Sequence, residues 1–433
     1  MYKKVLIISH NPITTYHAMG KTFLSLFSSF SEDELCQLYI YPTIPDIKKC
    51  SSYFRITDKD ILKSYFKFKV QSKEIDQKEI IESNNSMFEI SSDEKFYKNP
   101  KNKKSSINLV RDLMWKFSRW FNKDIKNWLD REMPTCIFIA PGKSKFIYDI
   151  AIKISKHLNI PIVTYVCDEY YFVEKPKALL DKIQIKALQR TIEKLMNKTS
   201  HIITICNPLK ELYSKKFKIP ATTVMTGSNL GISEGVQTKG SRTTLIYMGN
   251  IRYNRFLSLK EIGQAVDVFN EKYNADVKLD IYSPEKNEEI LSHFDNIKAI
   301  NLKGFVTGEE FIKTFNSADI LLHTEAFDKL NIDLVKNSVS TKIAESLASG
   351  ICLMAYGPED VASMRHLIDN NCAICATNKD YLEKALYDIY FNDEKVSEVT
   401  QNALLVAKKY HNTETNSKIV CEIMENINEN YSN

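Results

Sequence analysis

Several features that would place the chain outside an ordinary cytoplasm are missing. No apolar run reaches about eighteen residues, the length that a transmembrane helix needs. The N-terminus, Met1 to Ile8, has the pattern of a short strand followed by polar residues and lacks the layout of a signal peptide. The 9 cysteines are scattered and odd in number, which indicates free thiols in a reducing compartment. These features predict a cytoplasmic protein.

Strong cofactor motifs are also scarce. Cys372 and Cys375 form a C-x-x-C, but no second Cys or His pair lies near them, so two small buried residues are a better interpretation than a zinc or redox site. The loop His10 to Gly20 follows an apolar strand and holds a single glycine, so it is not the G-x-G-x-x-G fingerprint of dinucleotide-binding proteins. Gly20 is the residue of this loop that we expect to contact a donor substrate.

What the chain does have is a marked charge asymmetry. Residues 1–230 carry 38 Lys and Arg against 24 Asp and Glu, whereas the remainder carries 21 against 30. The basic part could face nucleic acid, an anionic membrane surface or an anionic substrate. A lysine-rich composition that only improves solubility is the alternative.

Strands and helices alternate regularly in both parts, which predicts an α/β protein with parallel sheets. We expect a Rossmann-like domain over 1–230, with an irregular insertion at 48–106 and one helix over 107–132 that carries all three tryptophans. A glycine- and serine-rich linker is expected over 231–243. A second Rossmann-like domain is predicted over 244–410, with a long loop through 328–337, and a final helix within 411–433.

Two helices of the basic part could lie on a membrane surface. The predicted helix 177–198 has a basic residue at every fourth position, which gives one continuous cationic stripe. The stripe comprises Lys182, Lys186, Arg190, Lys194 and Lys198. A solvated face and docking to anionic lipid headgroups both explain it. For the tryptophan-bearing helix, internal packing is favoured over an interfacial role, because a strand follows it at once.

The most informative stretch runs from Ser338 to Pro358. Ser340 or Thr341 is expected to cap the start of a helix that Gly350 ends, before a short apolar strand. Lys342 and Glu345 are three residues apart and so share a face of the first turn. A cation and a carboxylate at a helix N-terminus suit a ligand with a phosphate and a vicinal diol.

Polar residues that follow strands are further candidates, because ligands of open parallel sheets bind at the carboxyl ends of strands. Asp168 follows the strand 161–167 and is well placed for a polar substrate, although a solvated turn is the alternative. His323 and Glu325 stand at the end of the strand 319–324.

Two motifs resemble those of glycosyltransferase family 4, bacterial enzymes with the GT-B fold. They are Tyr247-Met248-Gly249-Asn250 with Arg255, and Ser340-Thr341-Lys342-Ile343-Ala344-Glu345 continuing to Gly350. The resemblance implies two Rossmann-like domains that face each other across a cleft. It also implies that Arg255 and Lys342 grip the donor diphosphate and that Glu345 binds the ribose. The further donor contacts implied are Gly249, Asn250, Val306, Ser340 and Thr341.

One position departs from the family pattern. Many members carry a second glutamate eight positions before Glu345, where this chain has Asn337. The sugar contact would fall to Asn337 itself, or to Glu325 or His323. We therefore expect catalytic roles for Asp168, Glu325 and Asn337.

The resemblance implies a retaining, metal-independent transferase that moves a sugar from a nucleotide-sugar onto a lipid-linked or growing cell-surface polysaccharide. The nucleotide-sugar would be a substrate, with no cofactor and no nucleic-acid partner. The basic domain would contact the inner face of the cell membrane peripherally. Two alternatives are a GT-B-like partner subunit without catalytic activity and a nucleotide-sugar epimerase.

Overall fold

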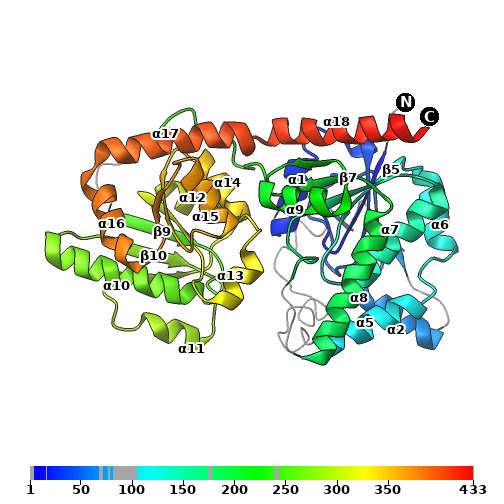
Figure 1. Cartoon of the computed structure of the whole chain (residues 1–433), viewed down its shortest axis with the longest axis horizontal. Coiled ribbons are helices and arrows are strands. Elements are labelled where there is room, and N and C mark those ends of the chain that lie inside the picture. Colours follow the sequence, from blue (N-terminus) through cyan, green and yellow to red (C-terminus); the bar gives the residue numbers. More distant parts are fainter. Residues whose placement is uncertain are drawn as a thin grey trace. The chain divides into compact units, whose positions relative to one another are not determined.

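The computed structural model divides the chain into two compact units. It describes residues 4–15, 17–67, 72–76, 79–80, 105–173, 178–237 and 243–432. Unit 1 comprises Met1–Met225 together with Thr413–Asn433, and unit 2 comprises Thr226–Asn412. Both are α/β units built on a parallel sheet (Figure 1). The predicted α/β class with two Rossmann-like domains is confirmed.

The sheet of unit 1 has 8 strands in the order β4-β3-β2-β1-β5-β6-β7-β8. All neighbours are parallel except β3 and β4. The first four strands along the chain are β1 (Val5–Ser9), β2 (Leu35–Tyr39), β3 (Ser52–Arg55) and β4 (Lys73–Glu74). The other four are β5 (Cys136–Ala140), β6 (Ile162–Val166), β7 (Thr199–Thr204) and β8 (Ala221–Thr223). Every residue of β1, β2, β5 and β6 is buried, because helices cover both faces of a parallel sheet.

The helices of unit 1 differ from the prediction between residues 48 and 132. Within the described residues they are α1 (Ala18–Leu26), α2 (Asp58–Lys67), α5 (Ser105–Phe117), α6 (Lys123–Glu132), α7 (Lys145–Leu158), α8 (Leu179–Met196), α9 (Asn207–Phe217) and α18 (Thr413–Ser432). The start of the supposed irregular insertion 48–106 is therefore a strand and a helix, β3 and α2. Most of the rest, 68–71, 77–78 and 81–104, lies outside the described residues.

The expected single helix over 107–132 is wrong, because two helices, α5 and α6, occupy this region. Asn122 stands between them and its side chain accepts hydrogen bonds from the backbone of Asp124 and Ile125, so it starts a new helix. Trp115, Trp120 and Trp128 are all buried. The tryptophans are therefore packing residues, as the sequence favoured.

The C-terminal helix α18 belongs to unit 1, although the chain has passed through all of unit 2 before reaching it. It packs against α1 and β7. Ser29 N donates to Ser417 Oγ at 2.9 Å, and the sulfur atoms of Cys136 and Met424 lie 3.6 Å apart. Unit 1 is thus assembled from both ends of the chain.

Unit 2 has a 6-stranded parallel sheet in the order β11-β10-β9-β12-β13-β14. The strands are β9 (Thr244–Met248), β10 (Lys278–Tyr282), β11 (Ile300–Gly304), β12 (Ile320–Thr324), β13 (Cys352–Tyr356) and β14 (Ile374–Ala376). Counted along the chain, this is the order 3-2-1-4-5-6 of the Rossmann fold. The order reverses between β9 and β12, and ligands of such sheets bind at that place.

The helices of unit 2 are α10 (Arg255–Tyr273), α11 (Glu288–Leu291), α12 (Gly308–Ser317), α13 (Lys329–Val335), α14 (Thr341–Ala348), α15 (Ala362–Asp369), α16 (Leu382–Phe391) and α17 (Asp393–Tyr410). The loop expected through 328–337 therefore contains a helix, α13. In the described part of the chain, no helix is long and apolar enough to cross a membrane.

The segment predicted as a linker is attached to unit 2 where the structure describes it. Ser233 N donates to Ala348 O at 2.8 Å and Gln237 N to Gly350 O at 2.7 Å. Gly350 itself has a φ of +76°, as expected for a residue that ends a helix in the left-handed conformation. The segment thus packs on the C-terminal end of α14.

Candidate functional site

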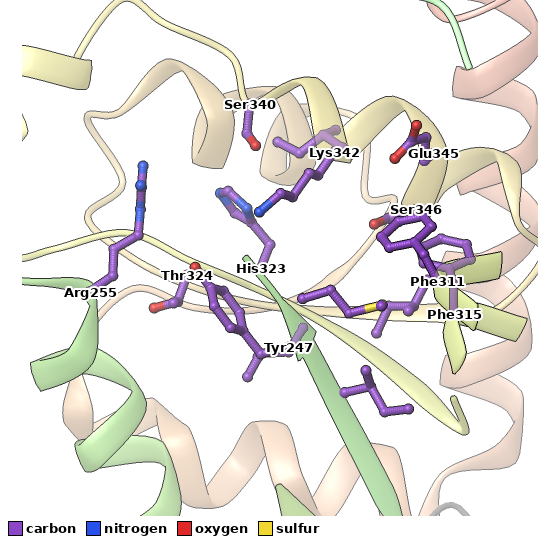
Figure 2. Close-up of a pocket in the computed structure, with 15 residues that line it drawn as sticks. Tyr247, Arg255, Phe311, Phe315, His323, Thr324, Ser340, Lys342, Glu345 and Ser346 are labelled. Atoms are coloured by element: carbon purple, nitrogen blue, oxygen red, sulfur yellow. The ribbon is translucent and has the colours of Figure 1, made fainter. Parts of the chain in front are cut away.

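A pocket lies at the carboxyl ends of β9 and β12, where the strand order of unit 2 reverses. Its polar lining comes from Tyr247, Arg255, His323, Thr324, Ser340, Lys342, Glu345 and Ser346 (Figure 2). Its apolar lining comes from Ile246, Met248, Phe311, Phe315, Leu321, Leu322 and Ile343.

The first turn of α14 supplies three of the predicted residues, Ser340, Lys342 and Glu345. Ser340 stands at the N-cap position in extended conformation, but its side chain makes no capping hydrogen bond, contrary to the expected cap. The backbone N–H groups of this first turn are therefore not satisfied by an N-cap side chain. Glu345 is 7% exposed, so its carboxylate is held inside the protein at the pocket wall.

Gly249 brings the amine of Lys342 close to the chain just after β9. A Cβ at this glycine would overlap Lys342 Nζ, so the absence of a side chain leaves space for the amine. Nζ lies 5.8 Å from the ring centroid of Tyr247, a cation–π distance. The Tyr247 hydroxyl in turn donates to Asn250 O at 2.8 Å. The turn after β9 and the start of α14 are thus fitted to each other.

Arg255 is positioned by a strained turn. The two preceding residues, Tyr253 and Asn254, have φ values of +58° and +59°, in the left-handed region that non-glycine residues rarely adopt. Asn254 Nδ2 donates to Asp328 Oδ2 at 2.9 Å, which ties the turn to the N-cap of α13. Arg255 is the first residue of α10. In Figure 2 its side chain lies on the same side of the pocket as Ser340.

Glu325 fixes the guanidinium of Arg255. Glu325 Oε2 accepts from Arg255 Nε at 3.0 Å and from Nη2 at 2.7 Å, and Oε1 lies 3.4 Å from His323 Nε2. Burial alone would raise the pKa of Glu325, but His323 and Arg255 outweigh it and lower the pKa below its ordinary value. Burial likewise opposes the charge of Arg255, and Glu325 nevertheless raises its pKa. The pair is therefore an ionised carboxylate and a guanidinium, both held in place.

The opposite side of the pocket is aromatic. Phe311 and Phe315 stand on one face of α12 and are stacked, with ring centroids 5.8 Å apart and 21° between their planes. In Figure 2 they lie beside Glu345 and Ser346, away from Arg255. The pocket therefore has a cationic side, an aromatic side and the Glu345 carboxylate. These phenylalanines were not predicted as site residues, although their i, i+4 spacing places them on one face of a helix.

Several of the predicted site residues are not part of the pocket lining. Asn250 Oδ1 accepts from Arg252 N at 2.8 Å and so shapes the turn after β9. Val306 is buried in the segment after β11, and Thr341 is the first residue of α14. Asn337 lies two residues beyond α13 and is partly buried. The roles predicted for these residues stay predictions.

The remaining predicted residues, Asp168 and Gly20, lie in unit 1. Asp168 follows β6 and accepts a hydrogen bond from the Tyr170 hydroxyl at 2.9 Å. A Cβ at Gly20 would lie 2.5 Å from the backbone N and O of Thr14, so this glycine allows the loop after β1 to pack against α1. A steric need of unit 1 therefore accounts for Gly20.

An Asp-x-Asp triplet at 58–60 was not considered when a metal-independent enzyme was predicted. In the structure, Asp58 forms an ion pair with Arg111 at 2.7 Å and accepts from Trp115 Nε1 at 2.6 Å. Asp60 accepts from the hydroxyl of Thr57 at 2.7 Å. These carboxylates secure the start of α2 against α5.

Four residues of the cationic stripe lie on α8, and Lys198 lies two residues beyond the end of this helix. All five are exposed: Lys182, Lys186, Arg190, Lys194 and Lys198. Among the apolar residues of α8, Leu188, Ile192 and Leu195 are buried, whereas Ile183 is 55% exposed. The N-terminal part of α8 is therefore exposed on its apolar side as well.

Comparison with known proteins identifies the fold. No family model matches the sequence, and no curated protein matches it either. Among solved structures, α,α-trehalose-6-phosphate synthase from Burkholderia multivorans has a TM-score of 0.60 at 10% identity, covering 100% of this chain and 98% of that one. Sucrose-phosphate synthase from Thermosynechococcus elongatus has a TM-score of 0.60 at 10% identity, with 98% and 99% covered. HepE from Anabaena, in complex with UDP-glucose, has a TM-score of 0.61 at 9% identity, again with 98% and 99% covered. These likenesses over whole chains show a GT-B fold.

Proposed function

We propose that this GT-B chain is a retaining glycosyltransferase that takes a sugar from a nucleotide-sugar donor. The observation that carries the proposal is the pocket of unit 2, which Arg255, Lys342 and Glu345 line at the switch point of a Rossmann sheet. Two cations and an uncapped helix start suit a diphosphate, and a buried carboxylate suits the vicinal hydroxyls of a ribose. The aromatic pair Phe311 and Phe315 lies where a nucleobase would complete the ligand.

The chemistry expected of this pocket is stabilisation of the leaving group. When the glycosidic bond to the donor breaks, the nucleoside diphosphate gains negative charge, and Arg255 and Lys342 would stabilise that charge without a metal ion. Because Glu325 already orients the guanidinium, little reorganisation is needed during the reaction. This supports a positioning role for Glu325 in place of the sugar contact considered from the sequence.

Retention of configuration would follow from attack by the acceptor on the face that the diphosphate leaves, with the diphosphate taking the acceptor proton. No protein base is required in that mechanism. Asp168 and Asn337 are proposed to contact the acceptor and the donor sugar respectively. The proposed acceptor is a lipid-linked or growing cell-surface polysaccharide. Solved structures with the same fold include TarM and HepE, the latter with UDP and glucose, which fits a role in glycosyl transfer in general.

Unit 1 is proposed to hold the acceptor near the cytoplasmic leaflet of the membrane. The exposed row Lys182, Lys186, Arg190 and Lys194 on α8 supports this, since anionic headgroups attract such rows by about 1 kcal/mol per basic residue.

The test is turnover of a panel of radiolabelled nucleotide-sugars by the full chain, with and without a lipid extract as acceptor. Transfer of label to lipid or polysaccharide, with release of nucleoside diphosphate, is the expected result. A donor sugar whose configuration changes without any acceptor would instead indicate an epimerase. Donor binding with neither hydrolysis nor transfer would indicate an inactive partner subunit. Mass spectrometry of nucleotides retained by the purified protein would identify the donor.

A further inference from the structure

Three neighbouring helices of unit 1 expose apolar side chains in helical register. On α2 these are Leu62, Tyr65 and Phe66; on α5 they are Val110, Leu113 and Phe117; on α8 they are Leu179, Leu180 and Ile183. The spacings are i, i+3, i+4 on α2, i, i+3, i+7 on α5 and i, i+1, i+4 on α8, so each set forms one stripe on its helix. We call these nine residues the apolar stripes.

The exposure of the apolar stripes is large. Phe66 is 80% exposed, Leu179 73% and Phe117 69%. Isolated exposed apolar residues are normal, but three stripes on adjacent helices are not expected of a surface that faces only water. The helices are adjacent because α5 packs against both α2 and α8, and the Tyr65 hydroxyl donates to Met114 O at 2.7 Å (Figure 1).

The charges on the same helices are unevenly exposed. Among their described side chains, the exposed charged residues are all basic: Lys59, Lys116, Lys182, Lys186, Arg190 and Lys194. The acidic residues Asp58, Asp60, Asp112, Asp181 and Glu193 are each at least partly buried. Several are also engaged, for example Asp112 with Lys145 N at 3.0 Å and Glu193 with the Tyr171 hydroxyl at 2.7 Å. The exposed side chains of these helices are therefore apolar or positively charged among the residues named.

We propose that the apolar stripes, with the basic residues beside them, dock unit 1 on the surface of an anionic lipid bilayer. Helices that lie in a membrane interface need apolar side chains to enter the acyl boundary and basic side chains to meet the headgroups. The exposed side chains of α2, α5 and α8 meet both requirements. This goes beyond the cationic row proposed above, because the apolar side chains become the main anchor. It deepens the membrane contact of the proposed function.

The test is co-sedimentation of the full chain with vesicles of phosphatidylglycerol and phosphatidylcholine, compared with phosphatidylcholine alone. A Phe66→Ser/Phe117→Ser/Leu179→Ser variant is expected to lose at least about tenfold in binding to the anionic vesicles. The matched control is Val268→Ser/Leu405→Ser, which removes side chains that are 61% and 63% exposed on α10 and α17. The control is expected to bind like the unaltered protein.

A second measurement does not depend on the triple variant folding. The native tryptophans are buried, so a Phe66→Trp variant adds an exposed indole. Its emission is expected to shift to the blue with anionic vesicles and to be quenched by brominated lipid. An unshifted, unquenched indole would overturn the proposal.

Other outcomes would overturn it in distinguishable ways. If Lys182→Gln/Lys186→Gln abolishes vesicle binding and the triple variant does not, the contact is electrostatic only. If the protein ignores vesicles but forms dimers that the triple variant breaks, the stripes bind a second copy. If the Tm of the triple variant is well below the Tm of the control variant, the stripes pack against other residues of this chain. None of these results affects donor binding by unit 2, whose failure would count against the glycosyltransferase itself.

Discussion

At the scale of single residues, the site depends on how buried charges are paired. Glu325 is 2% exposed and its carboxylate holds Arg255, while Glu345 is buried at the pocket wall. Burying a carboxylate costs free energy unless a partner compensates. Glu325 has that partner in Arg255. Glu345 lines the pocket, and the proposed ribose would add hydrogen bonds to it.

Glu345→Gln is expected to weaken donor binding. The loss of charged hydrogen bonds to the ribose should cost about 1 to 3 kcal/mol of binding free energy, which is roughly a fivefold to 150-fold rise in Kd. Isothermal titration with the donor or its nucleoside diphosphate measures this change. Glu271→Gln, on the exposed side of α10, is the control and should leave Kd unaltered. An unchanged Kd in Glu345→Gln would remove Glu345 from the donor site.

Glu325→Gln is expected to act through Arg255. The guanidinium would lose its charged partner, so donor affinity and kcat/KM should fall, with about 1 to 3 kcal/mol also lost from the free energy of unfolding. A double-mutant cycle with Arg255→Lys separates positioning from general damage. If Glu325 works by orienting Arg255, the double variant binds the donor no worse than Arg255→Lys alone. Strictly additive losses in donor affinity would contradict the positioning role.

At the scale of elements, two glycines, one in the turn after β9 and one in α1, have different neighbours. Gly249 faces the flexible end of Lys342, whereas Gly20 faces the backbone of Thr14. A methyl group can displace an amine at little cost, but it cannot displace a packed backbone without strain. Equivalent substitutions at the two glycines should therefore have different effects.

Gly249→Ala is expected to move the Lys342 amine from its position and weaken diphosphate binding about tenfold, with little change in Tm. Gly20→Ala should instead lower Tm, because the loop after β1 must shift. Gly235→Ala is the control, since a Cβ there meets nothing within 4 Å. Thermal unfolding and donor titration of the three variants check these outcomes. A Gly249→Ala variant with normal affinity would show that Lys342 does not need its position.

The sequence predicted elements well where apolar runs were continuous. The strands expected over 161–167 and 319–324 are β6 and β12, with bounds within one residue of the prediction, because fully buried parallel strands have near-continuous apolar patterns. Short elements were missed. The four residues of β3 lie among polar neighbours, and the seven residues of α13 expose Leu330 and Leu334 and so lack an amphipathic pattern.

The site was partly predictable for a similar reason. Lys342 and Glu345 share one helical turn, so their proximity followed from spacing alone. Phe311 and Phe315 meet them only because the order of strands places α12 near α14 at one pocket. The contact between Glu325 and Arg255 spans 70 positions in the chain, and no local pattern indicates such a pair.

At the scale of the whole molecule, buried neutral histidines link stability to pH. His366 Nε2 lies 3.0 Å from His411 Nε2, and His411 Nδ1 lies 2.8 Å from Thr226 O. Burial and the neighbouring His411 lower the pKa of His366 to about 3, and burial lowers the pKa of His411 to about 4. In unit 1, burial and Arg111 lower the pKa of His10 to about 3.

Stability should therefore fall on acidification. The unfolded histidines bind protons below their ordinary pKa of about 6.5, while the folded ones do not until pH approaches 3 to 4. Above about pH 6.5 neither the folded nor the unfolded histidine binds a proton, so these groups do not affect stability. Below that pH each histidine lowers the free energy of unfolding by about 1.4 kcal/mol per pH unit. Denaturant unfolding between pH 7 and pH 5 measures the slope. His366→Gln should reduce it, whereas the exposed His157→Gln should not. Equal slopes in all three proteins would contradict this account.

The membership of α18 in unit 1 has a consequence for the order in which the chain can fold during synthesis. Unit 2 is one continuous segment, Thr226–Asn412, and leaves the ribosome before the residues of α18 do. Synthesis of unit 1 begins first, but this unit lacks α18, the helix that packs against α1 and β7, until residue 432 has been made. The part of the molecule that is synthesised first is therefore the last to complete its core, and it must wait for the nested part to be finished.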